Sequence, residues 1–136
     1  NGIALKSLMD SLREYDPERL MLMFGCGGNR DRNRRFEMGK AAMETADFII
    51  VTSDNPRRED PGKIIEDITD VMKFCDKVIL AIPDRKKAIQ RAIAEGRRGD
   101  IIVIAGKGHE TYQIIGNETR HFDDREVILS CREDRK

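Results

Sequence analysis

Short apolar runs alternate along this chain with segments in which apolar residues recur every three or four positions. Unbroken apolar runs bounded by turn residues predict buried strands at 20–24, 48–51, 78–82 and 101–105. Between them, the wider spacing predicts amphipathic helices at 3–15, 38–45, 64–72 and 85–95. Asp60 and Asp84 stand where helix N-caps are expected, and Gly96 stands where a helix would end. The chain therefore alternates helix and strand.

The C-terminal part follows a different pattern. Two short stretches, 112–115 and 119–122, flank a Gly-Asn turn typical of an antiparallel hairpin. A last helix, capped by Asp123 or Asp124, is predicted after the hairpin. Apolar strands that alternate with helices indicate a parallel sheet covered on both faces. We therefore predict an α/β fold, a Rossmann-like three-layer sandwich whose mostly parallel sheet gains an antiparallel edge from the C-terminal hairpin.

Composition narrows the class of protein. The chain has 136 residues, a length that fits one domain. Its 25 basic and 25 acidic side chains cancel, and balanced charge argues against a nucleic-acid binder, which carries a basic excess. No apolar run approaches the ~20 residues of a membrane helix, no signal-peptide pattern is present, and the cysteines have no close partner. We expect a cytoplasmic domain with no membrane or nucleic-acid partner.

Glycine and charge gather in the loops that follow three of the predicted strands. Because parallel strands end at one edge of a sheet, these loops meet at the edge where α/β proteins bind ligands. The first, 25–35, combines glycines that open the backbone toward an anion with arginines suited to carboxylate or phosphate. It lacks the last glycine of a dinucleotide fingerprint, and solvated arginines on a flexible loop would look the same.

The second loop, 54–61, is more informative. Its two prolines restrict the backbone around Asn55 and Arg57, so that an amide and a guanidinium are presented with little freedom. Arginine suits a carboxylate, and asparagine suits either polar group of an amino acid. An ordinary turn with a helix cap would explain Asp60 and Pro61 but would leave Asn55 and Arg57 without a role.

The third loop, 106–110, is not a phosphate loop, since its lysine is followed by glycine rather than Ser or Thr. Glu110 could accept hydrogen bonds from a ligand ammonium, whereas a lone histidine such as His109 is more often a structural hydrogen-bonding residue than a base. Histidines and cysteines show no metal-ligand spacing, and no nucleophile motif is present. We expect no metal site and no catalytic residue in this chain.

Together the three loops resemble those of the C-terminal domain of Mur ligases, in particular the MurE-type UDP-N-acetylmuramoyl-tripeptide synthetases. The resemblance rests on residues 24–32, 51–57 and 105–110, with a weaker match at 122–126, in the family's order. It implies an enzyme that uses ATP to form an acyl phosphate on UDP-N-acetylmuramoyl-L-alanyl-D-glutamate, which a diamino acid then attacks during peptidoglycan synthesis. This domain would receive the amino acid and close over ATP.

The resemblance also implies binding residues. Asp54, Asn55 and Arg57 match the family's Asp-Asn-Pro-Arg motif, in which the arginine holds a carboxylate of meso-diaminopimelate. Family members that use L-lysine are expected to lack this arginine. Arg57 therefore favours meso-diaminopimelate, whose extra carboxylate needs a cation that would repel the ammonium of lysine.

Further contacts follow from the other two loops. Arg30 matches a second arginine that contacts the ligand, and Gly106 and Glu110 match contacts around its distal amino-acid end. Asn29 and Asn33 stand where Asp and Gly are usual, which leaves the contact residues themselves intact.

Full-length members of this family also carry a UDP-binding domain and a central ATPase domain with a P-loop. The resemblance implies that residues 1–136 are a single domain excised from the C-terminal end of a larger ligase, inactive alone. ATP, Mg²⁺ and UDP-N-acetylmuramoyl-dipeptide would bind through the missing domains, and the fragment alone would hold no cofactor. Two alternatives stay open: the same ligase with L-lysine as substrate, and a non-catalytic nucleotide- or anion-binding α/β module built on loop 25–35.

The balanced total charge hides an uneven distribution along the chain. Arginines crowd two of the three loops, at Arg30, Arg32, Arg34, Arg35, Arg57 and Arg58. We therefore expect the edge of the sheet to be positive toward a small dicarboxylate, while the domain as a whole stays neutral.

Overall fold

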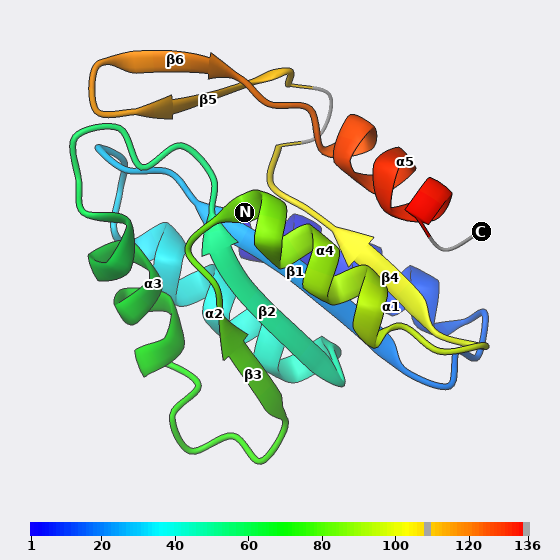
Figure 1. Ribbon diagram of the computed structural model, residues 1–136. Helices are drawn as coiled ribbons and strands as arrows, with labels where there is room; N and C mark the ends of the chain where they lie inside the picture. The colour runs from blue at the N-terminus through cyan, green and yellow to red at the C-terminus, as the bar shows by residue number, and fades with distance from the viewer. Residues whose placement is uncertain (108–109, 135–136) are drawn as a thin grey trace.

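A parallel sheet forms the centre of the molecule (Figure 1). The computed structural model describes residues 1–107 and 110–134. Within them, four parallel strands pair in the order β3-β2-β1-β4: β1 (Leu20–Cys26), β2 (Phe48–Ser53), β3 (Val78–Ala81) and β4 (Ile101–Ile104). Each strand overlaps its predicted apolar run, and the predicted α/β fold with a mostly parallel sheet is confirmed.

Helices cover both faces of this sheet. They are α1 (Gly2–Arg13), α2 (Asn33–Thr45), α3 (Pro61–Asp70), α4 (Arg85–Glu95) and α5 (Asp124–Asp134). Asp60 and Asp84 cap α3 and α4 as predicted, because their carboxylates accept from the amides of Gly62 and Lys87 at 3.1 Å. Asp123, rather than Asp124, caps the last helix, since its Oδ1 accepts from the Arg125 amide at 2.9 Å.

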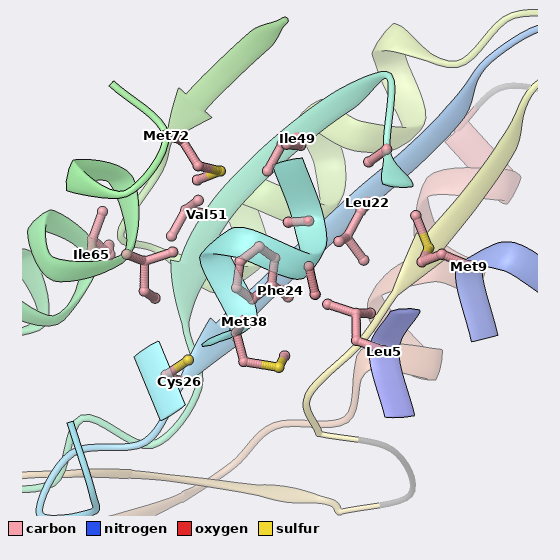
Figure 2. Close-up of a cluster of buried hydrophobic side chains, with 14 of the residues drawn as sticks. Leu5, Met9, Leu22, Phe24, Cys26, Met38, Ile49, Val51, Ile65 and Met72 are labelled. Atoms are coloured by element: carbon pink, nitrogen blue, oxygen red, sulfur yellow. The ribbon is translucent and has the colours of Figure 1, made fainter. Parts of the chain in front are cut away.

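The core lies on both sides of β1, every residue of which is buried. Leu22, Phe24 and Cys26 point into the cluster formed with α1, α2 and α3 (Figure 2). Met21 and Met23 point to the opposite face, against α4. Because both faces of a central strand are covered, neither face is exposed to solvent, and its sequence is an unbroken apolar run. Each fully buried side chain of this kind contributes about 1.5–3 kcal/mol.

The C-terminal hairpin is present, but its predicted place as an edge of the parallel sheet is wrong. Strands β5 (Tyr112–Ile115) and β6 (Glu118–His121) form a separate antiparallel pair. The backbone of β5 is held instead by the loop after β2, where Ile114 N donates to Asn55 Oδ1 at 2.9 Å and Arg57 N donates to Ile114 O at 3.0 Å. Those bonds occupy groups that an edge strand would offer to β4, so the hairpin lies over the loops (Figure 1).

Helix α2 begins earlier than predicted, at Asn33 rather than near Met38. Its first three residues, 33–35, are polar, so apolar spacing could not reveal them. The Asp31 carboxylate accepts from the Asn33 amide at 3.0 Å. Arg34 and Arg35 therefore belong to a helix and not to the loop.

The strand order places two loops at a topological switch point. From β1 the chain moves outward to β2 and β3, and then returns to add β4 on the other side of β1. The loops that follow β1 and β4 consequently diverge, and this is where open α/β sheets bind ligands. We call the carboxyl edge of the sheet the rim, and its loops rim loop 1 (27–32), rim loop 2 (54–60) and rim loop 3 (105–111).

Candidate amino-acid site at the rim

Rim loops 1 and 2 are in direct contact. Gly28 N donates to Asn55 O at 2.8 Å, and the Arg57 guanidinium returns a bond to Gly28 O at 3.0 Å. Only glycine permits this approach, since a Cβ at Gly28 would lie 1.9 Å from Pro56 O. A Cβ at Gly27 would lie 2.8 Å from Arg57 Nη1. The glycines of the first loop therefore make room for the second loop and its arginine.

Arg57 has an unusual backbone that aims its side chain at rim loop 1. Its φ is +52°, in the left-handed region, and its amide and carbonyl are held by Ile114 and Gly116 of the hairpin. The half-buried guanidinium donates from Nη1 to two carbonyls, Gly28 O at 3.0 Å and Asn55 O at 3.4 Å. Among the residues that the structure describes, no carboxylate forms an ion pair with it. Its charge is oriented but not neutralised.

Asn55 is buried, whereas the sequence predicted an amide presented to a ligand. Its amide oxygen accepts from Ile114 N at 2.9 Å, and its backbone carbonyl accepts from Gly28 N. It thereby joins rim loop 1 to the hairpin. Only the NH₂ group of its side chain is left to contact a ligand.

Asp54 supplies a carboxylate at the start of rim loop 2. Its Oδ1 atom is buried and has no hydrogen-bond partner among the described residues. Burial raises the pKa of Asp54, while the positive charges of Arg85, Lys107 and Arg57 oppose that rise. Rim loop 2 therefore carries an unpaired carboxylate oxygen and a guanidinium without an ion-pair partner among the described residues, which suit the ammonium and the carboxylate of an amino acid.

Rim loop 3 brings Gly106 and Glu110 to the same edge of the sheet. Gly106 has φ +109° and lies against the end of β1, where a Cβ would come within 3.5 Å of Gly25 O. Glu110 is half-buried, and its amide donates to Lys107 O at 3.0 Å. The interaction with its carboxylate raises the pKa of Tyr112, and its negative charge also raises the pKa of Asp54. His109 lies outside the described residues.

Lys107 is a rim residue that sequence reasoning passed over. Its side chain is almost fully buried, and Nζ donates to the Tyr112 carbonyl at the start of β5. Burial lowers the pKa of Lys107, and the nearby Asp54 carboxylate opposes that effect. The lysine thus points inward and anchors rim loop 3 to the hairpin, while Gly106 and Glu110 on either side of it stay at the rim.

Arg30 lies on the exposed tip of rim loop 1. Its Nη1 donates to Asn29 O at 3.2 Å, and within the described part of the chain it pairs with no carboxylate. Arg30 and Arg57 therefore come from two loops that are bonded to each other, and both carry free positive charge at the rim.

Fewer arginines carry an unpaired charge at the rim than the sequence predicted. Arg35 is buried and pairs with Glu59 at 2.6 Å and with Asp67 at 2.9 Å, and Arg32 also pairs with Asp67. Glu59 and Asp67 follow Arg35 by 24 and 32 residues, so no local sequence pattern predicts these ion pairs. Arg35 thus joins α2 to rim loop 2 and to α3, and Arg32 joins rim loop 1 to α3.

A second buried arginine supports the rim from below. Arg85 forms a two-point ion pair with Asp124, at 2.8 and 2.7 Å, and donates to Ser53 O and Ala105 O. It connects the ends of β2 and β4 to the start of α5. In the sequence Arg85 looks like an ordinary first residue of a helix, so no local pattern predicted its burial or its ion pair.

The described residues contain no group of three or more His, Cys, Asp or Glu side chains placed to hold a metal ion. None of the helices in the described ranges is long and apolar enough to cross a membrane.

Comparison with known proteins gives consistent matches. Residues 1–108 match the family described as "Mur ligase, glutamate ligase domain". The chain is 50% identical over 124 residues to the UDP-N-acetylmuramoyl-L-alanyl-D-glutamate–2,6-diaminopimelate ligase of Solibacter usitatus, covering 91% of this chain and 25% of that protein. It is 51% identical over 134 residues to the ligase of the same name from Trichormus variabilis, covering 98% of this chain and 27% of that one.

A solved structure of a ligase of that name superimposes with a TM-score of 0.95 at 39% identity, covering 99% of this chain and 28% of that one. The chain therefore spans about a quarter of the length of the curated relatives that it matches.

Proposed function

Since this chain belongs to the Mur ligase family, we propose that it is the amino-acid-binding domain of an ATP-dependent ligase that adds meso-diaminopimelate to UDP-N-acetylmuramoyl-L-alanyl-D-glutamate. The proposal places residues 1–136 as one domain at the C-terminal end of a longer enzyme. ATP, Mg²⁺ and the UDP-linked dipeptide would bind with other domains, and no residue of this chain is assigned to them. Use of those substrates would place the enzyme in the bacterial cytoplasm.

The observation that carries the proposal is Arg57, an oriented guanidinium without a carboxylate partner among the described residues. A planar fork of this kind binds a carboxylate in two-point fashion. meso-Diaminopimelate differs from L-lysine by a carboxylate at its distal end, so a cation there favours the former and repels the ammonium of the latter.

The other rim residues fit the remaining groups of such a ligand. Arg30 supplies a second cation for a carboxylate, and Asp54 and Glu110 supply acceptors for an ammonium. Gly106 brings bare backbone to the same edge. The NH₂ group of Asn55 can donate to either carboxylate. A zwitterion with two amino-acid ends needs this mixture of charges, whereas a phosphate would be repelled by the two acidic side chains.

The role of these groups is to hold the incoming amine in place. The amine nitrogen bonds to the glutamyl carbonyl carbon of the acyl phosphate. The carbon–oxygen bond to phosphate breaks, phosphate leaves, and the nitrogen loses a proton. Holding the two reactants in position contributes several kcal/mol, up to about 7–11 kcal/mol in the best-oriented cases. No residue of this chain is proposed to exchange that proton, so the isolated chain is expected to be inactive.

Substitution of Arg57 tests the proposal in the full-length ligase. We expect Arg57→Ala to raise the KM for meso-diaminopimelate by about ten- to hundredfold, because a charge-assisted bond is lost, and to leave the KM for ATP unchanged. Arg57→Lys should not restore binding, since a point charge does not replace a two-point fork. Arg98→Ala, at the opposite edge of the sheet, is the matched control. An unchanged KM in Arg57→Ala would reject the assignment.

The second candidate, a nucleotide- or anion-binding module, is tested on the isolated chain. Calorimetric titration with ATP, a UDP-sugar, L-lysine and meso-diaminopimelate should show no tight nucleotide binding. Micromolar affinity for either nucleotide would favour this alternative, and a preference for L-lysine would favour a different amino-acid substrate.

A further inference from the structure

One carboxylate, that of Glu59, adds a further bond between rim loops 1 and 2 and links both to helix α2. Its Oε1 accepts from the backbone amide of Asn29 at 2.8 Å. Its Oε2 accepts from Arg35 Nη2 at 2.6 Å. Each oxygen of the carboxylate therefore has its own partner, one on the loop that carries Arg30 and the other on helix α2.

The Arg35 end of this link is buried and ion-paired. The Arg35 side chain is only 2% exposed, and its Nη1 donates to Asp67 Oδ2 at 2.9 Å. Asp67 lies on α3 and also accepts from Arg32. Burial disfavours the charged form of Arg35, but the bonds from Glu59 and Asp67 outweigh burial and raise its pKa, so the network is held as ions. Glu59 is thus connected through Arg35 to helix α2, and through Arg35 and Asp67 to helix α3.

The near side leads directly to Arg57. Asn29, the residue that Glu59 holds, follows Gly28, whose carbonyl accepts from the Arg57 guanidinium. Asn29 has φ +54°, and its Oδ1 accepts from the amide of Arg58 at 3.1 Å. A shift of Asn29 therefore moves the carbonyl that aims Arg57.

We infer that Glu59 is a positioning residue for recognition of the amino acid: it holds the backbone of Asn29 against Arg35 and thereby sets where Arg57 presents its guanidinium. The inference rests on the proposed function, because it assigns Glu59 an effect on the same ligand. Glu59 itself touches no ligand group in this scheme.

The test is a kinetic double-mutant cycle in the full-length ligase. Glu59→Gln keeps the shape of the side chain but places a neutral amide between two donors, so one of the two bonds fails. We expect the KM for meso-diaminopimelate to rise about three- to thirtyfold, with kcat and the KM for ATP little changed. Glu66→Gln, which removes the same charge from an exposed position on α3, is the matched control.

The double variant separates positioning from general damage. If Glu59 acts through Arg57, then Glu59→Gln should add little to the KM of Arg57→Ala, since residues that share one contact do not add. Additive effects, or an unchanged KM in Glu59→Gln, would overturn the inference. If Arg57→Ala itself leaves the KM unchanged, the proposed function fails instead, and the two failures are distinguishable.

A second variant covers the case in which Glu59→Gln does not fold. Glu59→Asp keeps the charge but is one methylene shorter, so it cannot bond to both Asn29 N and Arg35 Nη2 as Glu59 does. The ion pair with Arg35 can be kept, so the fold should persist. A rise in the KM for meso-diaminopimelate supports the inference, and no rise overturns it.

Discussion

The buried ion pair of Arg85 with Asp124 allows a sharp prediction about stability. We consider Arg85→Met, which keeps most of the aliphatic stem and removes the guanidinium. The Arg85 side chain is 0% exposed and that of Asp124 is 6% exposed. The variant loses two bonds to the Asp124 carboxylate and one each to Ser53 O and Ala105 O. It also leaves a negative charge buried without its partner.

The magnitude follows from that unpaired charge. Breaking a buried pair by removing one partner costs about 3–5 kcal/mol, a large part of the ~5–15 kcal/mol that stabilises a typical domain. For a domain of this size the melting temperature should fall by about 10–20 °C. The carboxyl ends of β2 and β4 and the start of α5 should loosen together, because Arg85 contacts all three.

Urea denaturation of the 136-residue chain, followed by circular dichroism, measures the effect. Arg91→Met is the matched control on the same helix, since its exposed pair with Glu95 contributes at most about 0.5 kcal/mol. Adding Asp124→Leu to Arg85→Met should recover at least about 1 kcal/mol, because the buried charge is then gone. A loss in Arg85→Met no greater than in Arg91→Met, or a double variant less stable than the single one, would refute the reasoning.

Two further predictions concern ionisation. The bond from Arg19 holds the pKa of Asp100 below its usual value, so the carboxylate stabilises the fold above about pH 4 and loses that effect as pH falls through its native pKa. Asp100→Asn should therefore be less stable than the parent at neutral pH, and the difference in urea midpoint should shrink on acidification; a constant difference contradicts this. Burial raises the pKa of Cys26 to about 12, so iodoacetamide at about pH 8 should modify half-buried Cys75 but reach Cys26 only in urea. Peptide mass spectrometry reads the result, and rapid alkylation of Cys26 in the native chain would contradict it.

Much of the fold follows from local pattern. The apolar run at 20–24 predicted a strand covered on both faces, and the structure extends that strand to Cys26. Asp60 and Asp84 marked the beginnings of two helices because a cap bonds within its own turn. Alternating strands and helices imply parallel strands, and parallel strands bring their following loops to one edge. That chain of reasoning places Arg30, Asp54, Arg57, Gly106 and Glu110 at the rim without any coordinates.

What the sequence could not determine is which of these charges are free. Arg35 and Arg57 look alike in the chain, yet Arg35 is buried against Glu59 and Asp67, while Arg57 bonds only to carbonyls among the described residues. Asn55 likewise looks like a ligand contact, but its amide oxygen holds the hairpin.

The reason is physical. Amphipathic spacing and helix caps depend on groups a few residues apart, so they can be predicted from the sequence. Ion pairs such as Arg85 with Asp124 join residues 39 positions apart, and the hairpin lies over the rim because long-range bonds to Asn55 and Arg57 compete with β4 for its backbone. The sequence by itself therefore determined the layers of the fold and the rim. Only the tertiary structure decided which arginines at the rim bond to carboxylates and which, among the described residues, bond only to carbonyls.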